Sequence, residues 1–216
     1  AKNGDQQHQS LLPDMLAGKK IGAFLLTEPG AGSDASAIVT TARVANGHCE
    51  LNGAKAWITN GAIADVLSVY VQTDPGSGAK GIANYLIETD RAGVTRTTPY
   101  ELAGAGAMNV CGFEFVNSPL KNEEMMIEAG RAFKVAMGGI DLARAMVAVM
   151  CCGMLERSLK ESVNYTKARE VFGQPVAAHQ YPQHMLADVS TDLEAARALS
   201  ERAVETLALG ERATVA

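Results

Sequence analysis

The chain has 216 residues, of which 47% are hydrophobic and 20% charged, which is typical of a folded protein with one large or two small domains. Its formal net charge of -5 disfavours a nucleic-acid or anionic-membrane partner, because either would attract a basic surface. The longest apolar run, Ala145 to Leu155, is shorter than the roughly 20 residues of a membrane-spanning helix, so we expect no membrane insertion. The chain starts at Ala1 instead of Met and stops at Ala216 within an unfinished pattern, so we expect a fragment or a processed chain.

The first half of the chain contains short β-type runs separated by turn residues. A short helix is predicted for 5–18, broken at Pro13 because proline lacks a backbone N–H. Asn-Gly pairs, the strongest short hairpin signal, occur at 46–47, 52–53 and 60–61. The predicted strands are 21–26, 39–44, 48–51, 54–59, 66–73, 81–88, 93–98 and 110–116. This spacing predicts an antiparallel β-barrel or sandwich.

After residue 120 the pattern becomes helical. Apolar residues three or four apart predict one long helix from 140 to about 169 and a second from about 183 to 209, stopped by Gly210. Two such helices bury one stripe against each other as an antiparallel hairpin, and their remaining apolar surface needs further helices. The predicted class is therefore α+β, with a barrel or sandwich followed by the hairpin of an incomplete helical bundle.

The segment LLTEPGAGSD, residues 25–34, joins an apolar strand to a small polar loop. Gly30 and Gly32 have no Cβ, so a flat ligand can come close to this backbone. Thr27 and Ser33 place hydroxyl groups at the same edge. Most glycine-rich turns only reverse the chain, so the segment alone is a weak signal.

Two further segments have features suited to a planar ligand. In KAWITNG, residues 55–61, Trp57 is the only tryptophan and offers a flat face, with the hydroxyl of Thr59 nearby; the alternative is a tryptophan of the core. In KAREVFGQ, residues 167–174, Arg169 could contact a pyrophosphate and Phe172 could cover a ring. The alternative for Arg169 is a favourable position at a helix C-terminus.

Other catalytic signatures are weak or missing in the sequence. There is no G-x-S-x-G elbow and no Walker loop, and residues 104–109 imitate a dinucleotide fingerprint without its third glycine. The histidines and cysteines do not have the spacing of metal ligands, so we expect no metal site.

The order of these motifs resembles the acyl-CoA dehydrogenase family over essentially the whole chain. TEPGAGSD is followed by WITNG, a change from β to helical pattern, DLAR at 141–144, KAREVFGQ, and His179-Gln180 before a long amphipathic helix. The resemblance implies the tail of an N-terminal helical domain at 1–20, a middle β-barrel domain at 21–120, and the first half of a C-terminal helical bundle at 121–216.

The resemblance implies an FAD whose ring lies between the β-domain and the helical domains. The implied cofactor contacts are Phe24, Leu26, Thr27, Ser33, Trp57, Ile58, Thr59, Arg169, Phe172 and Gln180, the last three reaching the FAD of a neighbouring subunit. The residues implied to border the acyl-CoA are Ser33, Asp141 and Arg144. The implied reaction removes an α-proton with a carboxylate base and a β-hydride with the flavin, giving a trans-2-enoyl-CoA.

The sequence departs from the family pattern at the catalytic base. The usual glutamate is expected outside this chain, and the alternative position on the long helix holds Ala143, so no catalytic residue is predicted and the isolated chain is expected to be inactive. Within 101–117, AGAGAMNV replaces the usual glycine-arginine-serine element. A non-catalytic subunit or scaffold, and a flavin oxidase or monooxygenase on the same fold, therefore remain alternatives.

The resemblance also implies the surroundings of the protein. An electron-transfer flavoprotein is the expected electron acceptor, and a homotetramer or homodimer is the expected assembly. Acyl-CoA metabolism such as β-oxidation is the expected role, with the bacterial cytoplasm favoured over the mitochondrial matrix.

Overall fold

The computed structural model describes residues 4–45 and 48–213, and the chain divides into two compact units, Ala1–Val135 and Ala136–Ala216. The first unit carries a mixed β-sheet and the second carries long helices, so the predicted α+β class is confirmed. The finer division into three domains at residues 20 and 120 stays a prediction.

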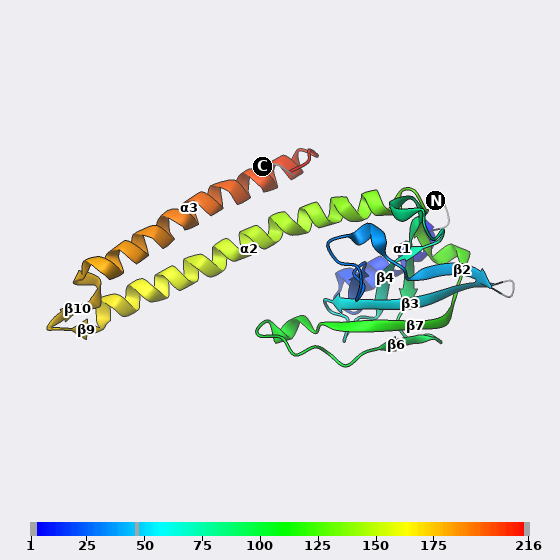
Figure 1. Ribbon diagram of the computed structural model, residues 1–216, viewed down its shortest axis with the longest axis horizontal. Coiled ribbons are helices and arrows are strands. Elements are labelled where there is room, and N and C mark those ends of the chain that lie inside the picture. Colours follow the sequence, from blue (N-terminus) through cyan, green and yellow to red (C-terminus); the bar gives the residue numbers. More distant parts are fainter. Residues whose placement is uncertain (1–3, 46–47, 214–216) are drawn as a thin grey trace. The chain divides into compact units, whose positions relative to one another are not determined.

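Eight strands form one sheet in the first unit (Figure 1). They are β1 Gly22–Leu25, β2 Thr41–Ala45, β3 His48–Ile58, β4 Val66–Gln72, β5 Ile82–Glu88, β6 Val94–Arg96, β7 Cys111–Leu120 and β8 Met125–Ile127. The strand order is β6-β7-β3-β2-β4-β5-β8, and β1 pairs with β4 in parallel. Among the described residues the outer strands β6 and β8 do not pair with each other, so the sheet does not close and the barrel form of the prediction is wrong.

The sheet consists of two halves joined at one position. β2 and β4 meet through a single parallel pair, Thr41 opposite Gln72. One hydrophobic core nevertheless includes Leu51 and Phe113 from one half and Leu67 from the other, all fully or almost fully buried. A shared core means that the two halves pack against each other, as in the sandwich form of the prediction.

Strand β3 is continuous through Asn52-Gly53, where the sequence predicts a hairpin. Gly53 has φ 137°, and the pairing of β3 with β7 shifts in register there, which makes an irregularity in the strand instead of a turn. A Cβ on Gly53 would lie 2.6 Å from the hydroxyl oxygen of Thr40 and 2.7 Å from its Cα, so only glycine allows this approach.

The other two Asn-Gly pairs have different outcomes. Asn46-Gly47 lies outside the described residues, although β2 and β3 pair in antiparallel fashion up to Ala45 opposite His48. Asn60-Gly61 forms a turn after β3, but β3 is not the sheet neighbour of β4, so this turn does not close a hairpin.

Three α-helices and five short 3₁₀ turns make up the helical elements of the described residues. The helices are α1 Gly4–Leu16, α2 Ala132–Ala168 and α3 Gln180–Ala208. The 3₁₀ turns are η1 Ala35–Ala37, η2 Gly78–Gly81, η3 Gly106–Met108, η4 Asn122–Glu124 and η5 Val176–Ala178. A two-strand hairpin, β9 Glu170–Val171 and β10 Gln174–Pro175, connects α2 to α3.

Two helix boundaries differ from the predictions. α1 continues through Pro13, because proline removes only one donor near the end of the helix and Ala17 N still donates to the Pro13 carbonyl at 3.0 Å. α2 begins at Ala132 instead of residue 140, because Gly138 and Gly139 lie inside the helix and do not interrupt it. The predicted stop at Gly210, which has φ 77°, lies just after α3.

The second unit is an antiparallel hairpin of α2 and α3 (Figure 1). Cys152 Sγ lies 3.7 Å from Ser200 Oγ, and Arg197 forms an ion pair with Glu156 at 3.4 Å. Many apolar side chains of the two helices remain exposed, among them Met146, Val147, Met150, Met154, Met185 and Leu199. This exposure agrees with a bundle that needs further helices.

Helix α2 is also the one helix among the described residues that is long and apolar enough to cross a membrane, judged by length and composition. The uninterrupted run of 145–155 is shorter than the apolar part of α2, because an apolar window of 18 residues can include up to two charged residues. A core helix of a soluble protein has the same features, so this is weak evidence and the absence of membrane insertion stays a prediction.

Candidate functional site

The loop that follows β1 is bonded to strand β3 beside Trp57. Ala56 N donates a hydrogen bond to the Thr27 carbonyl at 3.0 Å. Thr27 therefore lies against the residue that precedes Trp57. Through this contact the segments LLTEPGAGSD and KAWITNG form one edge of the first unit.

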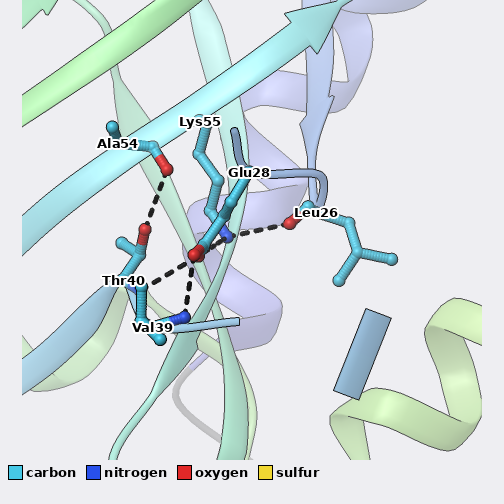
Figure 2. Close-up of polar contacts among 6 residues, drawn as sticks. All are labelled: Leu26, Glu28, Val39, Thr40, Ala54 and Lys55. Carbon is cyan, nitrogen blue, oxygen red and sulfur yellow. Dashed lines mark hydrogen bonds and ion pairs between the residues drawn. The ribbon is translucent and has the colours of Figure 1, made fainter. Parts of the chain in front are cut away.

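A buried ion pair joins Lys55 of β3 to Glu28 of the loop that follows β1 (Figure 2). Lys55 Nζ lies 2.9 Å from Glu28 Oε1, and the two side chains are 0% and 3% exposed. The same ammonium group donates to the Leu26 carbonyl at 3.0 Å. Leu26 and Glu28 flank Thr27, so Lys55 contacts both neighbours of that residue, the backbone of Leu26 and the side chain of Glu28.

The Glu28 carboxylate is also held by the start of the next segment (Figure 2). Val39 N donates to Oε2 at 2.8 Å and Thr40 N donates to Oε1 at 3.0 Å. The Thr40 hydroxyl in turn donates to the Ala54 carbonyl at 3.0 Å. Both carboxylate oxygens therefore have partners, as a buried charge requires.

The two buried groups influence each other's protonation. Burial raises the pKa of the Glu28 carboxyl, but the nearby Lys55 ammonium and the hydrogen bonds from Val39 and Thr40 outweigh it and bring the pKa below its usual value. Burial lowers the pKa of Lys55 to about 8, against the opposing effect of Glu28. At neutral pH the pair is therefore charged.

Trp57 is a surface residue, so the alternative of a core tryptophan is wrong. Its side chain is 60% exposed, and it lies where β3 has one residue more than β7 between Lys55 and Ile58. Such a bulge changes the direction of a side chain. Thr59 is also exposed, whereas Ile58 between them belongs to the core at 2% exposure. Any contact of Ile58 with a ligand at this edge would therefore be made by its backbone.

The other predicted residues of the first unit differ in accessibility. Phe24 is 46% exposed, with its ring 5.0 Å from that of Tyr70, and Ser33 is exposed. Thr27 is half-buried, whereas Leu26 is only 4% exposed. A Cβ at Gly30 or Gly32 would meet nothing within 4 Å, so the protein's own packing does not fill the space beside this loop.

Three predicted residues of the second unit cluster around the β9–β10 hairpin. Phe172 and Gly173 occupy its two-residue turn with φ 52° and 78°, as a type I′ turn requires. Phe172 is 95% exposed, which is extreme for a large aromatic ring. Arg169 follows the last residue of α2 and Gln180 begins α3, and both are exposed.

Asp141 and Arg144 form an ion pair on one face of α2, with Arg144 Nη1 3.1 Å from Asp141 Oδ1. The Arg144 side chain is 70% exposed and the Asp141 side chain is 21% exposed. Arg144 is therefore accessible to an anionic ligand, since an exposed pair of this kind is weak.

The comparisons with known proteins decide the family. Residues 23–118 match the acyl-CoA dehydrogenase middle domain, and residues 130–216 match the acyl-CoA dehydrogenase C-terminal domain. The chain belongs to the acyl-CoA dehydrogenase family. The resemblance inferred from TEPGAGSD and WITNG is thereby confirmed.

Relatives in the family cover nearly the whole chain. Over 93% of this chain, the sequence is 35% identical to an acyl-CoA dehydrogenase of Bacillus subtilis. Over 92% of this chain, it is 37% identical to the short-chain specific acyl-CoA dehydrogenase of Rattus norvegicus. These matches cover 53% and 48% of the two relatives, so the chain spans about half the length of the curated relatives it matches.

Solved structures of the family agree with the fold. An acyl-CoA dehydrogenase of Geobacillus kaustophilus matches 96% of the chain and 55% of its own, with a TM-score of 0.91 and 32% identity. Butyryl-CoA dehydrogenase of Megasphaera elsdenii matches 98% of this chain over 55% of its own length, with a TM-score of 0.91 and 35% identity. FAD is the cofactor that the acyl-CoA dehydrogenase family and its solved structures indicate for this chain.

The residues of the first unit fit a planar cofactor. The indole of Trp57 and the side chain of Thr59 are exposed, Thr27 is half-buried next to them, and the space beside Gly30 and Gly32 in the loop of Thr27 is open. The individual contacts to FAD and acyl-CoA stay predictions.

A separate hollow of about 670 Å³ in the first unit does not coincide with this edge. It is polar, and its lining includes Lys20, Glu88 and Arg91, but none of the predicted site residues. Lys20 pairs with Glu88 at 3.0 Å and Arg91 with Glu124 at 2.9 Å, so its charges largely compensate one another.

Sequence reasoning missed the residues that hold the edge together. Glu28 and Lys55 lie within the two motifs, but a charged residue next to a turn or strand usually faces solvent. A usable signal was the position of Lys55 in the otherwise apolar run 54–58, where a buried lysine side chain requires an acidic partner.

Proposed function

We propose that the complete protein is an FAD-dependent acyl-CoA dehydrogenase that converts an acyl-CoA thioester into a trans-2-enoyl-CoA. The observation that carries the proposal is the bonded edge of Thr27 and Ala56, which places an exposed Trp57 beside the TEPGAGSD loop. The named relatives support the same reaction class: butyryl-CoA dehydrogenase and short-chain specific acyl-CoA dehydrogenase.

In this proposal the residues of the chain bind and orient the cofactor and the acyl-CoA. Trp57 offers its indole surface to a planar ring, and the hydroxyls of Thr27 and Thr59 supply hydrogen bonds to polar atoms at the ring's edge. FAD, when bound, supplies the acceptor for the β-hydride. Arg169 and Arg144 are accessible cations for phosphate groups, Arg169 toward the cofactor and Arg144 toward CoA.

The catalytic base is proposed to lie outside these 216 residues. Ala143, next to Arg144, has no group that can accept a proton. We therefore expect the chain alone to lack dehydrogenase activity.

The surroundings of the protein follow the same proposal. An electron-transfer flavoprotein is the proposed acceptor, and a solved relative 35% identical to this chain carries that term in its description. A homotetramer or homodimer would give Phe172 a partner for its 95% exposed ring. β-Oxidation in the bacterial cytoplasm is the proposed role, and relatives occur in both bacteria and mitochondria.

The test is anaerobic titration of the purified protein, expressed from its complete reading frame, with acyl-CoAs of increasing chain length. We expect one of them to bleach the flavin absorbance at roughly 450 nm, a general flavin property. The matched control is the same acyl chain without CoA, which should leave the spectrum unchanged. Purified protein that carries no flavin would refute the proposal.

A second candidate is a flavin oxidase acting on a thioester of a carrier protein. Two solved relatives favour it: the prolyl acyl carrier protein oxidase AnaB, with 27% identity and a TM-score of 0.91, and PigA, described with FAD and proline, with 28% identity. The AGAGAMNV departure is compatible with a changed substrate. Admitting oxygen after anaerobic bleaching separates the two, because an oxidase recovers its absorbance rapidly and a dehydrogenase does not. A bound flavin whose absorbance none of the tested thioesters bleaches would favour the non-catalytic scaffold.

A further inference from the structure

Trp57 has a backbone conformation that disfavours bulky residues. Its φ is 60°, in the left-handed region, which is an outlier for a large aromatic residue. Such strain persists where the surrounding structure enforces it, and it concentrates at functional sites. The bulge in β3 and the backbone hydrogen bonds of Ala56 and Asn60 enforce this conformation, which sets the direction in which the Trp57 side chain leaves the strand.

The aromatic contact that the structure gives to Trp57 is Tyr100. The two ring centroids are 4.3 Å apart at an interplanar angle of 33°, a tilted contact of the two ring faces. Tyr100 is half-buried, whereas Trp57 remains 60% exposed. Tyr100 therefore covers part of the indole and leaves the rest accessible.

Tyr100 is itself held in place by its neighbours. Its N–H donates to the Val110 carbonyl at 2.9 Å. A Cβ at Gly112 would lie 2.9 Å from the Tyr100 hydroxyl oxygen, so the absence of a side chain at Gly112 makes room for the tyrosine.

The segment that follows Tyr100 is attached to the turn that follows Trp57. Asn60 N donates to the Met108 carbonyl at 2.8 Å, and Ala62 N donates to the Asn109 carbonyl at 3.0 Å. The AGAGAMNV segment and the KAWITNG turn are thus joined through their backbones. The two rings in contact lie beside this joint.

We propose that Tyr100 is a positioning residue that holds the indole of Trp57 in the orientation in which it receives a planar heteroaromatic ring. The proposal rests on the proposed function for the identity of that ring, the flavin of FAD. Tyr100 acts on the ligand through Trp57, by limiting rotation of the indole around its side-chain bonds. An indole already fixed in place loses less conformational entropy when the ligand binds.

Two measurements on Y100L, with Y100F as the conservative variant, test the proposal. The first is the emission of Trp57 in the 216-residue chain, where it is the only tryptophan. We expect Y100L to shift the emission to longer wavelength and to increase quenching by acrylamide, because the indole gains solvent contact. The second is the FAD dissociation constant of the protein expressed from its complete reading frame. We expect Y100L to weaken FAD binding about 2- to 10-fold, the equivalent of one aromatic pair. Y100F should keep the emission and the FAD dissociation constant of the wild type.

Controls separate positioning from folding. Y165L removes an exposed tyrosine of α2 and should change neither value. If Y100L does not fold by circular dichroism, Y100M, which fills similar space without a ring, replaces it. Unchanged emission in the ring-less variant, or changed emission with unchanged FAD affinity, would overturn the proposal. If the wild-type protein binds no FAD, the proposed function fails, while the emission measurement still tests the contact between Tyr100 and Trp57.

Discussion

Lys55→Met will destabilise the first unit by about 3–5 kcal/mol, the usual cost of removing one partner from a buried ion pair. The substitution leaves the Glu28 carboxylate, 3% exposed, without its cation and the Leu26 carbonyl without a donor. The hydrogen bonds from Val39 and Thr40 remain, but they do not neutralise the charge. The free energy of unfolding in urea, followed by Trp57 emission, measures the effect.

A double-mutant cycle identifies the source of this loss. In the Glu28→Met, Lys55→Met double variant no unpaired charge remains, so the two single effects should exceed the double effect by about 1–3 kcal/mol. Arg157→Met is the matched control, because Arg157 pairs with Glu161 on the surface of α2 and should cost less than about 1 kcal/mol. If Lys55→Met were as mild as Arg157→Met, the pair would not hold the edge.

Gly53→Ala will destabilise the same unit by at least about 2 kcal/mol, because it combines backbone strain with overpacking. The new Cβ would lie 2.7 Å from the Cα of Thr40, and a backbone atom cannot move aside by a change of rotamer. Displacing Thr40 also disturbs the hydrogen bond from its N–H to Glu28. We therefore expect both a lower free energy of unfolding and, in the complete protein, a weaker retention of FAD.

Gly104→Ala provides the comparison for this variant. A Cβ at Gly104 meets nothing within 4 Å and its φ is not in the left-handed region, so its unfolding free energy should stay within about 0.5 kcal/mol of the wild type. A Gly53→Ala protein as stable as Gly104→Ala would show that β3 and Thr40 can separate freely.

The sequence predicts the class of the fold because the period of its apolar residues changes once, near residue 120. Strands such as β4 and β5 were predictable from their long β-type runs, and α3 from its apolar spacing. The prediction of a hairpin turn at Asn52-Gly53 was wrong, because this pair makes an irregularity in β3 where Thr40, the residue before β2, approaches closely. Gly138 and Gly139 also led to a wrong prediction, since the neighbouring turns of α2 outweigh their low helix propensity.

The motifs of the site were predictable from the sequence, but the long-range contacts that position its residues were not. Thr27 and Trp57 were predicted as contacts of one cofactor through the family resemblance of their motifs, and the hydrogen bond from Ala56 to Thr27 brings the two segments together. The bulge that turns Trp57 outward depends on the pairing of β3 with β7, which is a long-range property. The ring contact of Tyr100 with Trp57 is also long-range, so no local pattern indicates it.

The most direct test is an experimental structure of the complete protein purified with its own flavin. We expect the flavin ring to lie in van der Waals contact with Trp57 and within hydrogen-bonding reach of Thr27 or Thr59. A flavin bound elsewhere, with Trp57 facing only solvent or another protein surface, would contradict the claim that this edge of the β unit was built to receive it.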